Sequence, residues 1–300
     1  MKILRLILPN ELSMNKKYFY SALLVSTLLL SLFISCRLPK EQSLLILASN
    51  DVHSQVDEFP ANHKRNAGKG GYVRKMAYID SMRTYHSNVL LLDAGDVSQG
   101  TPYFNMFGTS LQIELMNCMG YDAMTLGNHE FDNGMDSLAQ AISKAKFPII
   151  CSNYDFTQTP LEGKTVPYYI VEKSGLKIGL IGLGPDLNGL ASASKIGNTR
   201  YLDPVVQVNK YAELLKKKNC DLVIVISHLG YDDKNSVSDL FLAKNTRNID
   251  LILGGHTHTN MHEPNYVYDL DNKKVPITQS YYGGIKMTEI MYKFVKSRNL

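Results

Sequence analysis

One pattern occurs five times in this sequence: an apolar run that is typical of a strand, followed at once by side chains that can bind a metal ion. These side chains carry carboxylate, amide or imidazole groups, and none carries a thiol. An α/β fold brings the carboxyl ends of neighbouring strands together, so we expect the five segments to meet at one place. They are Asn50-Asp51-Val52-His53, Gly95-Asp96, Gly127-Asn128-His129-Glu130, Ser227-His228 and Gly254-Gly255-His256-Thr257-His258.

The rest of the chain alternates between strand-like and helix-like segments, which predicts a layered α/β domain. A hairpin is indicated at Ser174-Gly175, between strands at 168–172 and 176–181. Further strands are expected at 44–49, 89–92, 123–126, 148–151, 222–226, 249–253, 275–279 and 287–294, and helices at 70–85, 109–119, 136–145 and 203–218. Because no linker-like stretch divides residues 43–298, we expect one catalytic domain over residues 43–300.

The N-terminus has a composition of its own. Lys16 and Lys17 precede an apolar run of 14 residues, 21–34, which is short for a membrane span but typical of a signal peptide. Cys36 follows in a context that resembles a bacterial lipoprotein cleavage box. We therefore expect a signal peptide over residues 1–36, a lipid on Cys36, a tether over residues 37–42 and a location on the periplasmic side of the cell envelope.

Alternatives remain at this end of the chain. A plain signal peptide cut nearby, or an uncleaved anchor, would fit the same apolar run. Either Met1 or Met14 could be the start, because Lys16 and Lys17 form an ordinary basic segment after Met14.

Charge and cysteine content exclude several classes of protein. Four basic residues and one acidic residue lie in the first 36, so the remainder carries 28 basic and 27 acidic residues and a net charge of +1. No basic run with interleaved aromatic residues occurs, so a nucleic-acid duplex is not an expected partner. The odd number of remaining cysteines and their apolar neighbours predict buried free thiols at Cys118, Cys151 and Cys220.

The five segments together contain seven candidate metal ligands. Asp51 and His53 are two residues apart, which places both on one side of an extended segment. The Asp96 carboxylate could bridge two ions, and Asn128 offers a neutral oxygen. The full set is Asp51, His53, Asp96, Asn128, His228, His256 and His258. Such a set suits two ions of Mn²⁺, Zn²⁺, Fe²⁺ or Co²⁺, and a pair of ions activates water to attack phosphorus.

A further imidazole has a different expected task. His129 need not bind metal, and Asp132 comes within its reach if the backbone between them turns helically. A carboxylate bonded to one ring nitrogen fixes the tautomer and favours the protonated ring. This suits His129 to stabilise phosphoryl oxygens or to protonate a leaving alkoxide. The alternative is that Glu130 and Asp132 cap the next helix. The other histidines, His63, His86 and His262, lie in polar stretches and are expected at the surface.

The order and spacing of these segments across residues 44–295 resemble the calcineurin-like metallophosphoesterases, specifically the catalytic domain of bacterial 5′-nucleotidases. Gly100-Thr101-Pro102 also resembles the nucleotidase branch. The resemblance implies a four-layer αββα sandwich and a catalytic dyad of His129 with Asp132. It implies one ion held by Asp51, His53, Asp96 and His258, and a second held by Asp96, Asn128, His228 and His256.

The same resemblance sets the expected function. Two-domain 5′-nucleotidases continue into a C-terminal domain with phosphate-binding arginines and an aromatic clamp for the base, whereas this sequence stops at Leu300. Tyr281 and Tyr282 could replace the clamp, but we expect them to pack at a strand edge. We expect hydrolysis of nucleoside 5′-monophosphates by metal-activated hydroxide. The alternatives are a cyclic-nucleotide phosphodiesterase, a nucleotide-sugar hydrolase, or a catalytic half that needs a separately encoded partner resembling that C-terminal domain.

Overall fold

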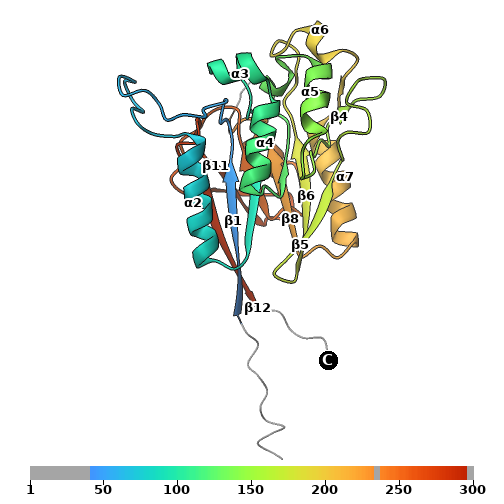
Figure 1. Cartoon of the computed structure of the whole chain (residues 1–300). Coiled ribbons are helices and arrows are strands. Elements are labelled where there is room, and N and C mark those ends of the chain that lie inside the picture. The colour runs from blue at the N-terminus through green and yellow to red at the C-terminus, as the bar shows by residue number, and fades with distance from the viewer. Residues whose placement is uncertain (1–40, 233–236, 296–300) are drawn as a thin grey trace, which may run out of the picture. The chain divides into compact units, whose positions relative to one another are not determined.

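The computed structural model describes residues 41–232 and 237–295 (Figure 1). The predicted signal peptide, Cys36 and most of the predicted tether lie outside the described residues. Residues 43–293 form one compact unit.

The first sheet has four strands in the order β12-β1-β2-β3. Its strands are β1 (Glu41–Ser49), β2 (Val89–Asp93), β3 (Ala123–Met124) and β12 (Thr288–Val295). The β1, β2 and β3 strands are parallel neighbours. Every residue of β2 is buried, and its apolar run over residues 89–92 is the pattern expected of a strand that is covered on both faces.

The second sheet has six strands in the order β10-β11-β9-β8-β6-β5. Its inner strands, β6, β8, β9 and β11, run parallel, while β5 and β10 are antiparallel edge strands. Ser174 and Gly175 both have positive φ, 56° and 74°, which confirms the predicted hairpin between β5 and β6. The strand bounds are β5 Tyr169–Lys173, β6 Leu176–Leu183, β8 Leu222–Ser227, β9 Leu251–Gly254, β10 Asn265–Tyr268 and β11 Lys274–Gln279.

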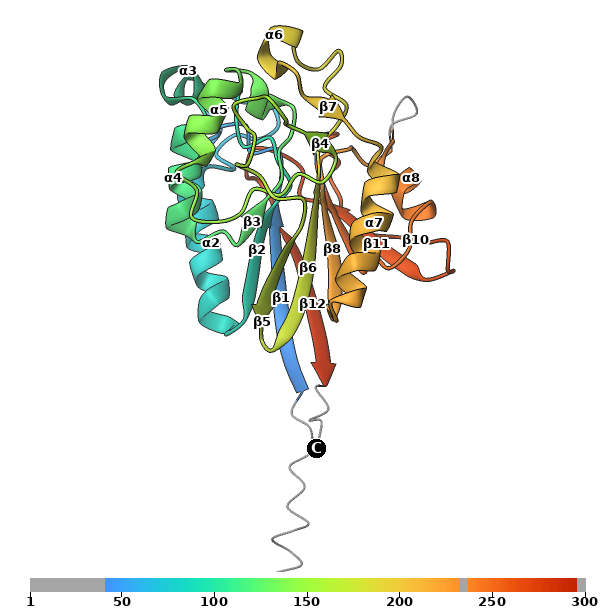
Figure 2. The same cartoon turned by 90° about the vertical axis from the view of Figure 1, so that its right-hand side faces the viewer.

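Helices cover the outer face of each sheet, as Figure 2 shows. On the first sheet these are α2 (Tyr72–Tyr85), α4 (Ser110–Met119) and α5 (Met135–Ile142), whose buried residues share one core with β1 and β2. On the second sheet they are α7 (Pro204–Lys217) and α8 (Asp239–Lys244). Helix, sheet, sheet and helix therefore follow one another, and the predicted four-layer αββα sandwich is confirmed.

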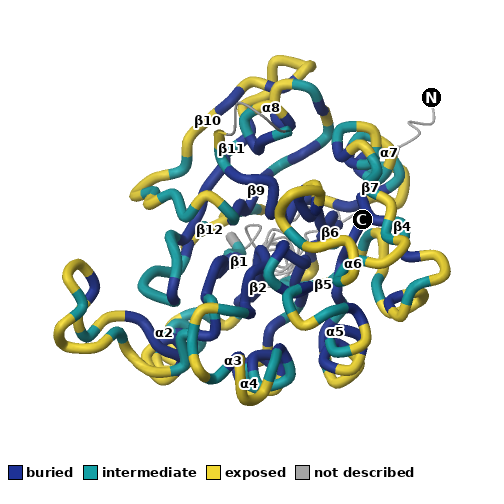
Figure 3. Tube along the Cα trace, turned by 90° about the horizontal axis from the view of Figure 1, so that it is seen from above, coloured by how far each residue is buried: buried dark blue, intermediate teal, exposed yellow. Residues whose placement is uncertain are grey.

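Short elements lie at the carboxyl ends of the strands. They are α3 (Pro102–Phe107), the 3-10 turn η1 (His129–Phe131), α6 (Ala193–Ile196) and the two-stranded sheet of β4 (Tyr154–Asp155) with β7 (Arg200–Tyr201). Seen from above in Figure 3, the buried strand segments lie at the centre and the exposed residues lie around the rim. Within the described ranges, no helix has both the length and the apolar character that crossing a bilayer would require.

Two expectations were wrong. Residues 148–151 form no regular strand, because Ile149 and Ile150 make only isolated bridges to Met124 and Val166. Cys118 is exposed, whereas Cys151 and Cys220 are buried as predicted. The reason is that α4 turns Ile113 and Met116 toward the core, and Cys118 lies on its other side.

Candidate metal centre

The first two ligand-bearing loops are joined by their backbones. The N–H groups of Asp51 and His53 donate to the carbonyl oxygens of Gly95 and Asp96, at 2.9 and 3.0 Å. Asp51, His53 and Asp96 all have positive φ, between 50° and 56°, which is uncommon for residues other than glycine. Such backbone strain persists only where the surrounding structure holds it, and it is concentrated at functional sites.

Asp51, His53 and His258 form one group of side chains that could hold a metal ion. The Nε2 atoms of the two imidazoles face each other at 2.9 Å, and Asp51 Oδ1 lies 3.3 Å from His258 Nε2. His53 Nδ1 lies 3.2 Å from the carbonyl oxygen of Ser98, which favours a proton on Nδ1 and a free lone pair on Nε2. Burial lowers the pKa of His53, so the neutral form that binds a metal is favoured.

Asp96, His228 and His256 form a second group beside the first. His228 Nε2 lies 2.9 Å from Asp96 Oδ2, and both side chains are buried. The Nδ1 atom of His228 contacts the carbonyl oxygen of Ala94 at 2.5 Å, which points Nε2 toward the carboxylates. Burial alone would lower the pKa of His228, but the Asp96 and Asp51 carboxylates outweigh it and raise the pKa to about 10. Burial would likewise raise the pKa of Asp96, but the neighbouring His228 holds it below its usual range.

Asn128 is the one predicted ligand outside these groups, and its environment fits the prediction. It is buried, and its Oδ1 atom has no hydrogen-bond partner within the described part of the chain. The backbone N–H of the next residue, His129, donates to Asp96 Oδ1 at 2.8 Å, so Asn128 adjoins the second group. Buried carbonyl oxygens without partners are rare. This oxygen, together with the imidazole and carboxylate groups around it, fits a divalent cation.

His129 and Asp132 meet as predicted. His129 Nδ1 lies 2.8 Å from Asp132 Oδ2, because the η1 turn brings residues three apart to one side. Burial would lower the pKa of His129, but the Asp96 and Asp132 carboxylates outweigh it and raise the pKa. The ring centroids of His129 and His53 are 5.3 Å apart, and His53, Asp96 and His129 form a third group of side chains that could hold a metal ion.

Glu130 has a role that the sequence pattern did not indicate. It does not cap the next helix. Its buried carboxylate accepts hydrogen bonds from the backbone N–H groups of Gly127 (2.7 Å), Asp96 (2.9 Å) and Ser98 (3.1 Å). Glu130 therefore ties the loop after β3 to the loop after β2. The only available signal was an acidic residue inside an otherwise buried motif.

Two more residues shape the centre by close packing and by hydrogen bonds. A Cβ atom on Gly127 would lie 2.2 Å from Asp96 Oδ1 and 2.7 Å from His228 Nε2, so only glycine fits there. Gln279, at the end of β11, donates to the carbonyl oxygen of Gly255 at 2.7 Å and accepts from the N–H of Thr259 at 2.9 Å. It thereby holds both ends of the loop that carries His256 and His258.

The expected place of Tyr281 and Tyr282 was wrong. They do not pack at a strand edge but lie in the loop between β11 and β12, beside the metal-binding groups. The Asn50 side chain donates to the Tyr281 carbonyl oxygen at 2.8 Å, and the Gly283 N–H donates to the Asp51 carbonyl oxygen at 2.7 Å. The Tyr282 ring stacks on His258, with centroids 5.2 Å apart. Contacts between residues more than 200 positions apart set this arrangement.

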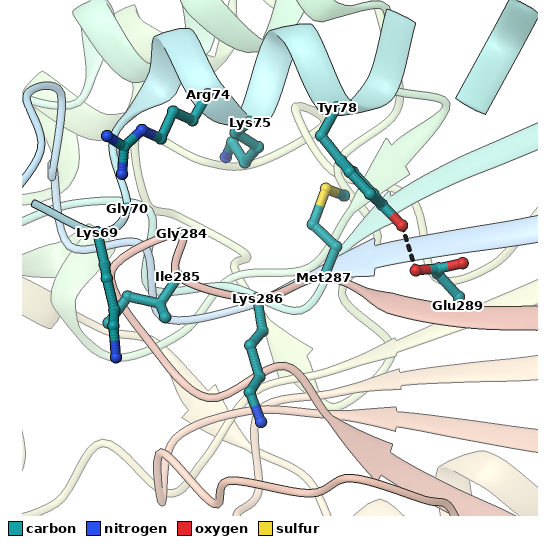
Figure 4. A pocket seen from close by; sticks show the side chains of 10 residues that line it. All are labelled: Lys69, Gly70, Arg74, Lys75, Tyr78, Gly284, Ile285, Lys286, Met287 and Glu289. Carbon is teal, nitrogen blue, oxygen red and sulfur yellow. Dashed lines mark hydrogen bonds between the residues drawn. The ribbon is translucent and has the colours of Figure 1, made fainter. Parts of the chain in front are cut away.

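A cavity of about 440 Å³ lies between α2 and the loop that leads into β12 (Figure 4). Lys69, Arg74 and Lys286 line it, as does the side chain of the buried Lys75. None of the seven candidate metal ligands contributes to its lining. The metal centre is therefore a separate feature at the carboxyl ends of the strands.

The family model of the calcineurin-like phosphoesterases matches residues 44–260. This range contains every residue of the three groups that could hold a metal ion. The chain belongs to that family.

Individual relatives are 5′-nucleotidases and related proteins. The snake venom 5′-nucleotidase of Gloydius brevicauda is 33% identical over 261 residues, which cover 80% of this chain and 43% of the venom protein. The crystal structure of the 5′-nucleotidase precursor of Thermus thermophilus has 29% identity and a TM-score of 0.73, and it covers 84% of this chain and 54% of that one. The calcineurin-like phosphoesterase YfkN of Bacillus subtilis has 26% identity and a TM-score of 0.70, covering 86% and 87%. The chain spans about half the length of the curated relatives that it matches.

Proposed function

We propose that this protein hydrolyses nucleotide phosphate esters at a centre of two divalent metal ions. The observation that carries the proposal is the meeting of two ligand groups, Asp51-His53-His258 and Asp96-His228-His256, beside the imidazole of His129, which is grouped with His53 and Asp96. Two ligand groups at one place suit two ions. An imidazole that is hydrogen-bonded to a carboxylate, as His129 is to Asp132, suits proton transfer. Relatives named 5′-nucleotidase and NAD nucleotidase support a nucleotide as the substrate.

Different side chains would hold the two ions. Asp51, His53 and His258 would hold one ion, and Asp96, Asn128, His228 and His256 the other, with Asp96 placed to contact both. Mn²⁺, Zn²⁺, Fe²⁺ and Co²⁺ all suit this ligand set. When bound, such ions supply activated water and positive charge near the phosphorus.

His129 contributes separately from the ligands. Asp132 holds its Nδ1 atom, which leaves Nε2 to donate a proton to a phosphoryl oxygen or to the leaving alkoxide. The Asp96 and Asp132 carboxylates favour the protonated ring that this donation needs.

Metal removal tests the proposal directly. The purified protein should lose hydrolysis of AMP on chelation and regain it when Mn²⁺, Zn²⁺ or Co²⁺ is added back. Asp96→Asn should lose activity and at least one ion, because it removes the charge that stands between the two groups. Metal analysis that finds a single ion per active wild-type molecule would refute the two-metal centre.

Substrate range separates the remaining candidates. The alternatives are a cyclic phosphodiesterase and a nucleotide-sugar hydrolase. We propose nucleoside 5′-monophosphates as the first candidate substrates, because relatives named 5′-nucleotidase match 80% of this chain or more. A panel of AMP, UMP, a cyclic nucleotide, a nucleotide sugar and p-nitrophenyl phosphate would rank them. The panel is run with and without a protein resembling the nucleotidase C-terminal domain, which tests whether a partner is required.

We also propose that the protein is anchored by a lipid on Cys36 and faces the periplasm. This rests on the apolar run of residues 21–34 and on the cysteine that follows it.

A further inference from the structure

Aromatic rings form a continuous row that starts inside the metal centre. The centroid of His53 lies 5.3 Å from that of His129 and 4.9 Å from that of His258. The next ring is Tyr282, which stacks on His258 with centroids 5.2 Å apart and an interplanar angle of 15°. The row therefore passes from the metal-binding imidazoles to a residue that binds no metal.

Beyond Tyr282 the row widens. The Tyr281 ring lies 4.6 Å from that of Tyr282, Phe59 lies 5.8 Å from it on another side, and His63 lies 4.8 Å from Phe59. These four residues, Phe59, His63, Tyr281 and Tyr282, are all partly exposed, and we call them the aromatic shelf. Asn66 donates to the Tyr282 hydroxyl at 2.7 Å and so joins the loop after β1 to the loop after β11.

The backbone of the shelf is strained. Tyr281 has a φ of 70°, a conformation that is unfavourable for a bulky side chain. Hydrogen bonds from Asn50 to the Tyr281 carbonyl oxygen and from Gly283 to the Asp51 carbonyl oxygen hold this turn against the first ligand loop. A strained aromatic residue that is fixed to a ligand loop and left partly exposed is not explained by packing of the core.

We infer that the aromatic shelf receives the base of a nucleoside 5′-phosphate whose phosphate lies at the metal centre, an inference that rests on the proposed function. Tyr281 is two ring contacts away from the metal-binding His258, at 5.2 and 4.6 Å. In a nucleoside 5′-phosphate the sugar separates the phosphate from the base. With the phosphate at the metal centre, the base therefore extends past the ligands to the rings of Tyr281 and Tyr282. An aryl group bonded directly to the phosphate oxygen is too short to do so.

The same chemistry defines the class of substrate. Stacking on aromatic rings accepts every base, because each base has a π-face. The shelf therefore favours nucleotides over sugar phosphates and discriminates little among bases.

Ribose 5-phosphate is the matched probe, because it is AMP without its base. The experiment measures kcat/KM for AMP and for ribose 5-phosphate with the metal-loaded protein, and compares their ratio among variants. Wild type should prefer AMP by about tenfold or more, the range expected from stacking of one base.

Two variants remove the shelf. Tyr281→Asn removes one ring, and asparagine tolerates the positive φ at this position. Tyr282→Leu removes the ring next to His258. In each, the ratio should fall at least fivefold, mainly through a higher KM for AMP. Tyr282→Phe keeps the ring and should keep the ratio. Tyr85→Leu, at the end of α2, is the control for loss of an exposed tyrosine and should also keep it.

The outcomes distinguish failure of the aromatic shelf from failure of the proposed phosphoesterase function. An unchanged ratio, or an equal loss of rate on both substrates, would overturn the shelf and leave the phosphoesterase standing. If wild type turns over neither substrate, the proposed function fails, and calorimetric binding of the two ligands to the metal-loaded protein decides instead. AMP that binds no more tightly than ribose 5-phosphate would overturn the shelf in that case as well.

Discussion

At the scale of single residues, His129 is the side chain whose removal is most informative. It contacts Asp132 through Nδ1 and stands beside the metal-binding groups, while six other side chains supply the two groups that we assign to the ions. We expect His129→Ala to retain both ions and to lose about 10²- to 10⁴-fold in kcat, the usual contribution of a positioned acid or base. Metal analysis and steady-state kinetics on one preparation check both parts.

Asp132→Asn is the companion variant. It keeps the size of the side chain but removes the charge that favours the protonated ring, so its activity should fall less than that of His129→Ala. Normal turnover by His129→Ala would show that the dyad is assigned to the wrong residues.

Lys75 is a second informative residue, because its ammonium group is buried. It is 3% exposed, and its Nζ atom has no hydrogen-bond partner among the residues that the structure describes. It lies 4.3 Å from the Tyr72 ring centroid, a cation–π contact. Burial lowers its pKa, and burial raises the pKa of the neighbouring Asp93, while each charge partly offsets the burial of the other.

Lys75→Met should change how stability depends on pH. Without the cation, the pKa of Asp93 in the folded protein should rise further above its unfolded value. The folded protein then holds this proton more tightly than the unfolded chain, so stability falls as pH rises from about 4 to above 7. We expect the loss to approach about 1.4 kcal/mol per pH unit in that window.

Urea denaturation in chelating buffer at several pH values measures this slope. The double variant Lys75→Met/Asp93→Asn lacks both ionisable groups and should lose the steep slope. Burial already raises the pKa of Asp93 to about 7 in wild type, so the two proteins should differ in slope above pH 7. A Lys75→Met protein whose stability runs parallel to wild type above pH 7 would contradict the charge coupling.

At the scale of elements, the loop after β3 must approach the loops after β2 and β8 very closely. We expect Gly127→Ala to lose metal and activity together, because its Cβ would come within 2.2 Å of Asp96 Oδ1 and 2.7 Å of His228 Nε2. Gly163→Asn is the control, since open space surrounds Gly163 and asparagine tolerates its φ of 71°. Circular dichroism should show both variants folded. Full metal content in Gly127→Ala would mean that the loop can move away at little cost.

The local order of elements could be predicted from the sequence, and so could most of the side chains that the structure brings together at the candidate metal centre. Apolar runs such as Leu222–Ser227 identify buried strands, and the polar residues at their ends identify the site. The predictions that failed concern residues whose positions depend on contacts with residues distant in the sequence. Glu130 acts on a loop 34 residues away, and the loop that carries Tyr281 and Tyr282 is held by hydrogen bonds to Asn50 and Asp51, more than 200 positions away. The order of strands in each sheet has the same non-local origin, which local periodicity does not encode.

At the scale of the whole molecule, the proposed attachment to a membrane can be tested through one residue. Cys36 should carry lipid, and the protein should partition with membranes through acyl chains. Cys36→Ser should release a soluble protein or leave an unprocessed precursor. The intact mass of the membrane-extracted wild type decides, because a mature N-terminus at any other residue would rule out this modification.

The order of strands in the first sheet has a consequence for biosynthesis. The β1 strand lies between β2 and β12, so its second neighbour is translated more than 230 residues after it. A nascent chain on the ribosome cannot complete this sheet until Thr288–Val295 has emerged from the exit tunnel. Until then β1 presents an open edge, which is a template for pairing with another chain. Polypeptides released before residue 288 should therefore aggregate rather than fold, and chaperones that cover open strand edges should be needed for most of the time that translation takes.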